Sequence, residues 1–255
     1  MNTKFLITAD SNRSALLKKK IIHYYIANGD ATIAELCKEM DLSIPTVTKL
    51  VGELLDDGYI LDFGKQETNG GRKPNIYGLN PVSGYFVGVD VFRSKINIAA
   101  VDFKGDKLRV EENIPYSLEN TPEALEMLCN LINDFIDRLS VPREKVLAVG
   151  VNISGRVNPV SGYSYSIFYF EEKPLSQILE ERIKIKIYIE NDTRAMMYGE
   201  YMQGVVKGEK NILFINMGWG LGLSIFINGE LYYGKSGFSG EFGHFCFFDN
   251  EILCH

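Results

Sequence analysis

The spacing of apolar residues changes once along this chain. From Ser14 to about Pro81, apolar residues recur every three or four positions in three short segments, which predicts amphipathic helices. From Tyr85 onward, apolar and polar residues alternate as they do in half-buried strands. We therefore place a domain boundary near residue 80, with one domain over 1–80 and a second over 81–255.

Three helices are predicted in the first domain. The first stops at Asn28-Gly29, a common C-terminal signal, and the second opens with Thr32 and Glu35 at the spacing of a capping box. Ser43 is expected as the N-cap of the third helix, with Pro45 in its first turn. The inward-facing residues are predicted to be Leu16, Leu17, Ile21, Ile22, Tyr25 and Ile26, then Ile33, Leu36, Cys37 and Met40, then Val47, Leu50, Val51, Leu54 and Leu55. A tight connection before the third helix predicts a helix-turn-helix.

The third helix has the surface expected of a recognition helix. Its outer face carries small polar and charged side chains near the N-terminal end, where such helices meet base edges. A wing is predicted to follow, from strands at 59–61 and 75–79 joined by a polar loop that carries three cations. Loops of this kind reach phosphates or a minor groove. The expected DNA-contacting residues are Ser43, Thr46, Thr48, Lys49, Lys65, Arg72 and Lys73.

Charge leaves a second interpretation of this domain open. Residues 1–80 contain ten Lys or Arg and ten Asp or Glu, so the rest of the chain carries all of the net charge of −6. A neutral helical domain also suits protein interaction or dimerisation. DNA binding is favoured because the basic clusters at 18–20 and at Lys65, Arg72 and Lys73 are placed as a phosphate footprint requires.

The second domain begins with three predicted strands and continues with alternating helices and strands. The strands are expected at 85–91, 95–103, 107–114, 146–153, 184–189, 211–217, 221–227 and 230–233, and the helices at 122–139, 175–182 and 193–206. Three antiparallel strands followed by alternating elements are the order of an actin-like, ribonuclease-H-type lobe. The fold class is therefore predicted to be α/β.

Five short stretches of the second domain contain glycines, and four of them also contain carboxylate or amide side chains. They are Gly88-Val89-Asp90, Gly150-Val151-Asn152-Ile153-Ser154-Gly155, Glu190-Asn191-Asp192 with Gly199-Glu200, Gly218-Trp219-Gly220-Leu221-Gly222, and Ser239-Gly240-Glu241-Phe242-Gly243-His244. With the winged helix, the chain resembles the ROK family, which groups bacterial sugar kinases with sugar-responsive repressors. The resemblance implies an N-terminal winged helix-turn-helix and the first lobe of a sugar-kinase fold. The second lobe is expected to be missing or incomplete, with its sheet lying beyond this chain.

The resemblance implies roles for four residues. In the family's kinases the aspartate at the position of Asp192 takes a proton from the sugar hydroxyl, and the preceding asparagine, here Asn191, holds the sugar. Asp192 lies between a predicted strand and a helix, whose positive end favours the ionised carboxylate. Glu241 and His244 come from a Gly-rich turn and suit recognition of vicinal hydroxyls. From the residues alone, 191–193 is also a helix cap, and His244 is also a structural histidine.

The nucleotide-binding turns of the family are altered in this sequence. The kinases use an Asp-x-Gly-x-Thr turn, whereas Asp90 is followed by Val91-Phe92-Arg93-Ser94. Without a glycine, backbone amides approach phosphates less readily. A second turn, expected as Gly-Thr-Gly, contains Trp219 in place of the small hydroxyl residue. ATP is therefore not expected as a cofactor.

Zinc is the other cofactor that the resemblance brings in. The family has a structural site of one histidine and three cysteines, and His244 and Cys254 match its first two ligands. Cys246 and His255 are uncertain substitutes for the others. Because a closed structural site uses four ligands, we expect this site to be incomplete.

Composition narrows the location and the class of function. Four scattered cysteines, no apolar leader and no run of 18 apolar residues predict a cytoplasmic protein without membrane contact. The leading hypothesis is a transcriptional repressor that binds operator DNA and a sugar or phosphosugar, as a homodimer when the protein is complete. The alternative is an ATP-dependent sugar kinase with Asp192 as general base.

Overall fold

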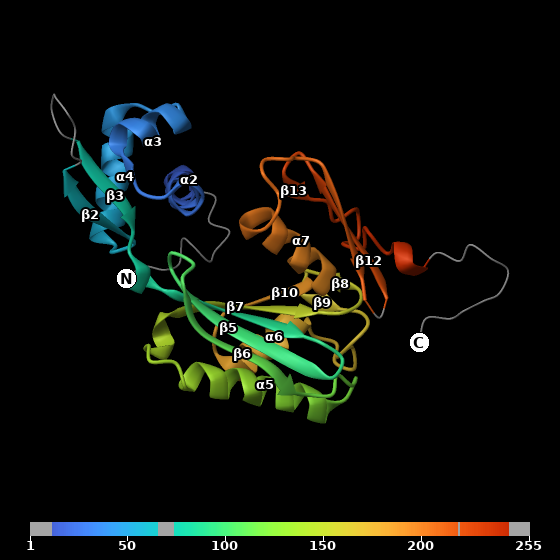
Figure 1. Ribbon diagram of the computed structural model, residues 1–255. Coiled ribbons are helices and arrows are strands. Elements are labelled where there is room, and N and C mark those ends of the chain that lie inside the picture. The colour runs from blue at the N-terminus through green and yellow to red at the C-terminus, as the bar shows by residue number, and fades with distance from the viewer. Residues whose placement is uncertain (1–11, 66–73, 219, 245–255) are drawn as a thin grey trace. The chain divides into compact units, whose positions relative to one another are not determined.

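The computed structural model describes residues 12–65, 74–218 and 220–244 (Figure 1). Its N-terminal part contains helices α2 (Arg13–Asn28), α3 (Ile33–Met40) and α4 (Ile44–Asp56). Strands β1 (Ala31–Thr32), β3 (Asn75–Leu79) and β2 (Ile60–Lys65) form an antiparallel sheet in that order. Three helices followed by a β-hairpin are the winged helix-turn-helix that the sequence predicts.

The predicted helix signals operate through local hydrogen bonds. Gly29 caps α2 at a φ of 79°, which suits glycine, and its N–H donates to Tyr25 O over 2.9 Å. The Thr32 N–H donates to Glu35 Oε2 over 2.8 Å, and the Glu35 N–H donates to Thr32 Oγ1 over 3.3 Å, which confirms the capping box. Ser43 occupies the N-cap position of α4, but its hydroxyl bonds to Thr46 Oγ1 instead of a backbone N–H.

The buried side of the three helices agrees with the apolar pattern, with two exceptions. Leu16 and Ile26 were expected to face inward, and this was wrong, because they are 49% and 40% exposed. Both lie at the margin of the helical stripe, where spacing alone does not separate buried from exposed positions. The strand β1 was also missed, since two residues are too few to show alternation.

A five-stranded sheet forms the centre of the second part. Its order is β10 (Ile187–Asn191), β7 (Val146–Ile153), β4 (Tyr85–Val91), β5 (Lys95–Asp102) and β6 (Lys107–Pro115). Helices α5 (Pro122–Asp137) and α6 (Leu175–Ile183) cover one face of this sheet (Figure 1). Strand β10 begins three residues later than predicted, because Lys184 caps α6 in a left-handed conformation with a φ of 63°.

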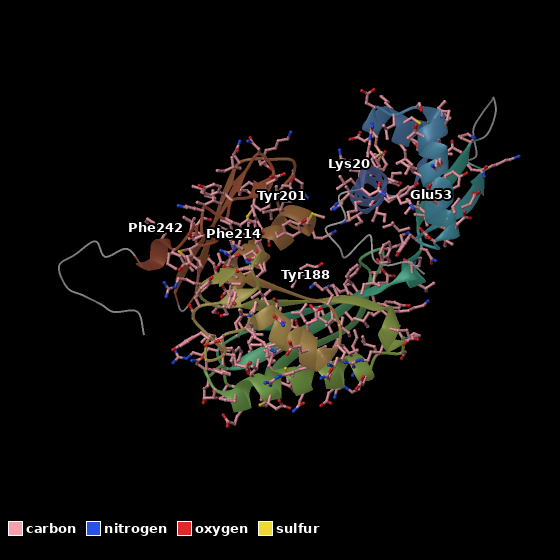
Figure 2. The ribbon with its side chains drawn as sticks, turned by 180° about the vertical axis from the view of Figure 1, so that it is seen from behind. Lys20, Glu53, Tyr188, Tyr201, Phe214 and Phe242 are labelled. Carbon is pink, nitrogen blue, oxygen red and sulfur yellow. The ribbon has the colours of Figure 1, made fainter. Side chains whose placement is uncertain are left out.

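A second, smaller sheet follows helix α7 (Asp192–Gln203). It consists of β11 (Ile212–Met217), β12 (Leu221–Ile227) and β13 (Glu230–Leu231), all antiparallel. The α7 side chain Tyr201, labelled with Phe214 of β11 in Figure 2, lies 4.7 Å from the Phe226 ring of β12 between centroids. This sheet corresponds to the strands that the sequence predicts at 211–217, 221–227 and 230–233, and it precedes His244. A short hairpin of β8 (Val157–Asn158) and β9 (Tyr163–Ser164) was not predicted.

The chain divides into two compact units, and the winged helix does not form one of them alone. The first unit comprises 1–87, 99–110 and 139–148, and the second comprises 88–98, 111–138 and 149–255. In the first unit, Leu147 of β7 and Phe103, which directly follows β5, lie in one buried cluster with residues of the three helices. The domain boundary near residue 80 stays a prediction, but hydrophobic burial continues across it.

We expect Phe103→Ala to loosen the winged helix, although Phe103 follows β5 of the larger sheet. The Phe103 ring lies 5.6 Å from the Tyr59 ring and 6.1 Å from the Phe86 ring between centroids. Removing a buried phenylalanine costs about 3–5 kcal/mol of unfolding free energy. Denaturation and amide hydrogen exchange measure the loss, which should include α4. The matched control is Leu108→Ala on β6, because that side chain is exposed. Unchanged exchange in α4 would contradict the shared core.

Candidate functional site

The first candidate site is the outer surface of α4. Ser43, Thr46, Thr48 and Lys49 are all exposed there, as a recognition surface requires. The Lys49 side chain is 78% exposed and its Nζ lies 3.9 Å from Glu53 Oε1, a weak contact that leaves the cation accessible. Ile44, which is 63% exposed, was missed by the sequence analysis. An exposed apolar residue at the start of this helix suits contact with a thymine methyl group.

The basic groups around this surface are not equivalent. Lys18 Nζ lies 2.8 Å from Glu53 Oε2 and 3.5 Å from Asp57 Oδ2, so it joins α2 to α4. The expectation that residues 18–20 form a phosphate footprint therefore does not extend to Lys18, which is mostly buried in this contact. Figure 2 labels Lys20 on α2 and Glu53 on α4.

The base of the wing is ordered by an aspartate. Asp62 Oδ1 accepts from the Gly64 N–H over 2.8 Å, and Asp62 Oδ2 accepts from Asn75 Nδ2 over 2.7 Å. These bonds fix the start of the hairpin at a shift in register between β2 and β3. Lys65 is exposed at its end. The other two predicted wing cations, Arg72 and Lys73, lie outside the described residues.

The second candidate site lies where β4, β7 and β10 end. Asp192 begins α7 directly after β10, and its Oδ1 accepts from the Thr193 N–H over 2.7 Å. Its Oδ2 accepts from the Ser154 hydroxyl over 2.8 Å. Ser154 follows β7 and belongs to the stretch from Gly150 to Gly155, but the sequence did not predict its role. Strand-end position was the available signal, because ligands of α/β sheets gather at the carboxyl ends of strands.

Asp90 on β4 has an unusual acidity. Burial raises the pKa of the Asp90 carboxyl to about 6, the Asp192 carboxylate adds to this increase, and Lys95 opposes it. Two carboxylates that influence one another's ionisation are typical of functional sites. Asp90 belongs to the Gly88-Val89-Asp90 motif, but its proximity to Asp192 could not be predicted from the motif.

Asn191 serves as a structural cap in this conformation. Its Oδ1 accepts from the Arg194 N–H over 3.1 Å, and its Nδ2 donates to Gly155 O over 3.0 Å. The prediction that Asn191 caps the following helix is therefore confirmed, since it is the N-cap of α7. Binding of a sugar by the same amide stays a prediction, since it requires further hydrogen bonds or an exchange of partners.

The Gly-rich turn that carries Glu241 packs against β12. A Cβ atom at Gly240 would collide with Leu223 O, and one at Gly243 would collide with Leu221 O. On β12, between Leu221 and Leu223, lies Gly222, where a Cβ atom would collide with Thr193 Oγ1. Glycine is required at these close approaches. Through β12, the turn with Glu241 therefore reaches the start of α7, where Asp192 lies. Glu241 itself is half-buried.

The turn after Asp90 lacks the glycine of the kinase turn, and one of its amides is used within the protein. The Phe92 N–H donates to Lys95 O over 2.9 Å and closes a tight hairpin, and Lys95 Nζ lies 5.4 Å from the centre of the Phe92 ring. This amide is thus engaged within the protein. Trp219 of the second turn lies outside the described residues.

No group of three or more His, Cys, Asp or Glu that could hold a metal ion occurs among the described residues. His244 ends the last 3₁₀ turn, Phe242–His244, while Cys246, Cys254 and His255 lie outside the described residues. None of the helices described is long and apolar enough to cross a membrane.

Comparison with known proteins identifies the class. Residues 16–60 match the winged helix-turn-helix DNA-binding pattern, and residues 86–255 match the ROK family. This chain belongs to the ROK family. The resemblance and the fold class expected from the sequence are confirmed.

Several relatives are transcriptional regulators. The xylose repressor of Bacillus subtilis (strain 168) is 27% identical over 239 residues, which are 93% of this chain and 62% of that protein. The DNA-binding transcriptional dual regulator NagC of Escherichia coli (strain K12) is 27% identical over 219 residues, 85% of this chain and 53% of that protein. This chain therefore spans less than two thirds of the length of these relatives.

Solved structures agree on the fold. A ROK family transcriptional regulator, described as a homologue of the E. coli MLC protein, aligns with a TM-score of 0.74 at 22% identity, over 94% of this chain and 62% of the other. A ROK family glucokinase from Streptomyces griseus, solved with glucose and AMPPNP, aligns with a TM-score of 0.57 at 28% identity, over 67% of this chain and 53% of the other.

Replacing Asp90 should change how stability depends on pH. Because folding raises the pKa of this carboxyl to about 6, its ionisation destabilises the folded protein progressively between about pH 4 and pH 6. Asp90→Asn should therefore gain about 1 kcal/mol relative to wild type on going from pH 4.5 to pH 7.5, less than a fully buried group would give. Melting temperatures at the two pH values measure this gain. Asp106→Asn, in an exposed turn, is the control, and an equal difference at both pH values would contradict the assignment.

Proposed function

We propose that this protein is a sugar-responsive transcriptional repressor. The observation that carries the proposal is that one chain combines a winged helix-turn-helix with a ROK domain. In this ROK domain the carboxylates remain at the strand ends, but the turn after Asp90 is a hairpin closed by the hydrogen bond from the Phe92 N–H to Lys95 O. The xylose repressor and NagC, to which the chain is similar along most of its length, support the same function.

On the DNA side, α4 enters the major groove and the wing follows the backbone. Ser43, Thr46, Thr48 and Lys49 contact base edges and phosphates from one exposed surface. Lys65, Arg72 and Lys73 supply positive charge from the hairpin. In this proposal a dimer of the complete protein reads a two-fold operator.

On the sugar side, carboxylates and amides suit a polyhydroxylated ligand. Asp192, Asn191, Glu241 and His244 hold the effector, with Ser154 keeping the Asp192 carboxylate in place. A sugar that binds one conformation more tightly shifts the DNA affinity by the same coupling free energy. No step of this proposal uses zinc, whose site at His244 and Cys254 stays an expectation.

A sugar kinase is the second candidate, favoured by the carboxylate of Asp192 at the strand ends. As general base, Asp192 would take the proton of the sugar hydroxyl that attacks the phosphoryl group. ATP would also need a phosphate cradle, and Phe92 and Arg93 occupy the turn that follows Asp90. Phosphorylation of a sugar panel with ATP separates the two candidates, since turnover would contradict the repressor-only proposal.

The proposed function is tested by selecting bound genomic DNA and then measuring retardation of that DNA with and without xylose, glucose or N-acetylglucosamine. We expect specific retardation that at least one of these sugars changes tenfold or more. Specific DNA binding without a response to any of them would contradict the sugar arm. Absence of specific DNA binding would contradict the whole proposal.

Replacing Lys49 should weaken DNA binding by removing a cation from α4. If Lys49 contacts one phosphate, the slope of log affinity against log salt concentration falls by about 0.9 for Lys49→Ala. Fluorescence anisotropy across a salt series measures this slope. Lys104→Ala, an exposed lysine in the turn between β5 and β6, is the matched control. An unchanged affinity and slope would remove Lys49 from the interface.

Replacing Glu241 should abolish the sugar response and spare DNA binding. Glu241 lies in the turn packed on β12, far along the chain from α4, so the two activities share only the coupling free energy. For Glu241→Ala we expect operator affinity without sugar within twofold of wild type and loss of the sugar effect. Glu230→Ala on β13 is the exposed control. Equal loss of both activities would make Glu241 a structural residue.

A further inference from the structure

Arg194 is a buried arginine near the start of α7. It lies in the first turn of α7, two residues after Asp192, and it is only 2% exposed. Burial of a guanidinium is costly unless its donors are satisfied. The partners of Arg194 therefore show what this position does.

Three hydrogen bonds from Arg194 connect three separate segments. Its Nε donates to Glu190 Oε1 over 2.6 Å. One terminal nitrogen donates to Gly237 O over 2.9 Å, and the other donates to Val157 O over 2.7 Å. The guanidinium thus joins the end of β10, the β8 strand and the segment that precedes Glu241. The fixed planar fork of arginine can make these bonds simultaneously, whereas a lysine ammonium lacks that geometry.

Glu190 extends the same network to the candidate sugar site. Besides Arg194, its carboxylate accepts from the Asn191 N–H over 2.7 Å and from the Tyr233 hydroxyl over 3.1 Å. Burial and the Glu190 carboxylate raise the pKa of Tyr233, so the hydroxyl remains a donor. The Arg194 guanidinium lies 5.4 Å from the centre of the Tyr233 ring. The ion pair of Arg194 and Glu190 is therefore hydrogen-bonded both to Asn191 and to the segment that precedes Glu241.

The segment from 234 to 240 is rich in glycine and depends on contacts with its surroundings, among them a hydrogen bond from the Ser239 hydroxyl to Tyr232 O and an edge contact between the Phe238 and Tyr165 rings, 5.1 Å apart between centroids. Gly234, Gly237 and Gly240 all have positive φ values, of 67°, 81° and 91°. Glycine loses much conformational freedom when it is fixed. Asn158 Nδ2 donates to Ser236 O over 3.3 Å, and the Ser239 N–H donates to Tyr233 O over 3.2 Å. The charge-assisted bond from Arg194 to Gly237 is shorter than either and comes from a buried donor.

We propose that Arg194 is the positioning residue that holds the Glu241 turn in register with Asn191 and Asp192. A buried ion pair often contributes little net stability, but it specifies one arrangement of the segments that it joins. Here the segments carry the two halves of the sugar site, so the network sets the affinity for the effector without touching it. This inference rests on the proposed function only for its sugar-binding consequence.

The test compares Arg194→Lys with Arg182→Lys, in which the exposed ion pair to Glu126 is altered on α6 instead. Amide hydrogen exchange and binding of xylose, glucose and N-acetylglucosamine are measured on all three proteins. In Arg194→Lys we expect residues 234–241 to exchange at least tenfold faster while α5 and β7 keep their protection. The affinity for the sugar that binds the wild type should fall at least tenfold. The Arg182→Lys protein should behave as wild type.

The outcomes separate this inference from the proposed function. Unchanged exchange at 234–241, or unchanged sugar affinity in Arg194→Lys, overturns the role of Arg194. Absence of binding of all three sugars to the wild type contradicts the proposed function instead. If Arg194→Lys does not fold, Glu190→Gln is used in its place. The wild type also allows a test that needs no substitution, namely hydrogen exchange with and without its sugar. Saturation of the wild type with its sugar should protect residues 190–194 and 234–241 together, and protection of one segment without the other overturns the coupling.

Discussion

The shared hydrophobic core at Phe103 is the constraint on which the rest of this structure depends. The winged helix buries Tyr59 and Leu54 in the same cluster as Phe103 and Leu147, which come from the larger sheet. The Asn80 N–H donates to Tyr59 O over 2.9 Å, and the Phe103 N–H donates to Pro81 O over 3.2 Å. Within the first unit, the residues on either side of position 80 are therefore joined by hydrogen bonds and by packing.

This constraint gives the proposed regulation a physical route. Strand β4 carries Phe86, which packs on the shared cluster, and Asp90, which lies beside Asp192. Four residues of strand span about 13 Å. A ligand that changes the position of the strand end acts on a segment whose other end belongs to the core of the winged helix. Coupling through one packed strand requires no separate relay, and its size is set by how differently the ligand binds the two conformations.

Most elements could be predicted because their signals are local. The capping box of Thr32 and Glu35, and the alternation that gives β4, β7 and β12 their bounds, involve residues within a few positions of one another. Long-range contacts were not accessible in the same way. Phe103 was included in a strand, but its packing on Tyr59 joins residues 44 positions apart in the numbering of the chain.

The candidate site shows the same division. Asp192, Asn191 and Glu241 could be predicted from motifs. The roles of Ser154 and Arg194 could not, because they depend on hydrogen-bond partners that only the folded chain brings close. The beginning of β10 was misplaced for a related reason. Lys184 takes a left-handed conformation to end α6, and nothing in its side chain favours that backbone over an extended one.

The two carboxylates at the strand ends are compatible with binding in the absence of turnover. Asp192 accepts hydrogen bonds from Ser154 and Thr193, and the raised pKa of Asp90 lets its carboxyl carry a proton near pH 6 and donate a hydrogen bond. Hydroxyl groups of a sugar need acceptors and donors of this kind whether or not a reaction follows. Phosphoryl transfer additionally requires that the phosphates be positioned in line with the attacking hydroxyl. In the hairpin after Asp90 the Phe92 N–H is already bonded to Lys95 O, which supports the proposal that these carboxylates recognise a ligand rather than catalyse phosphoryl transfer.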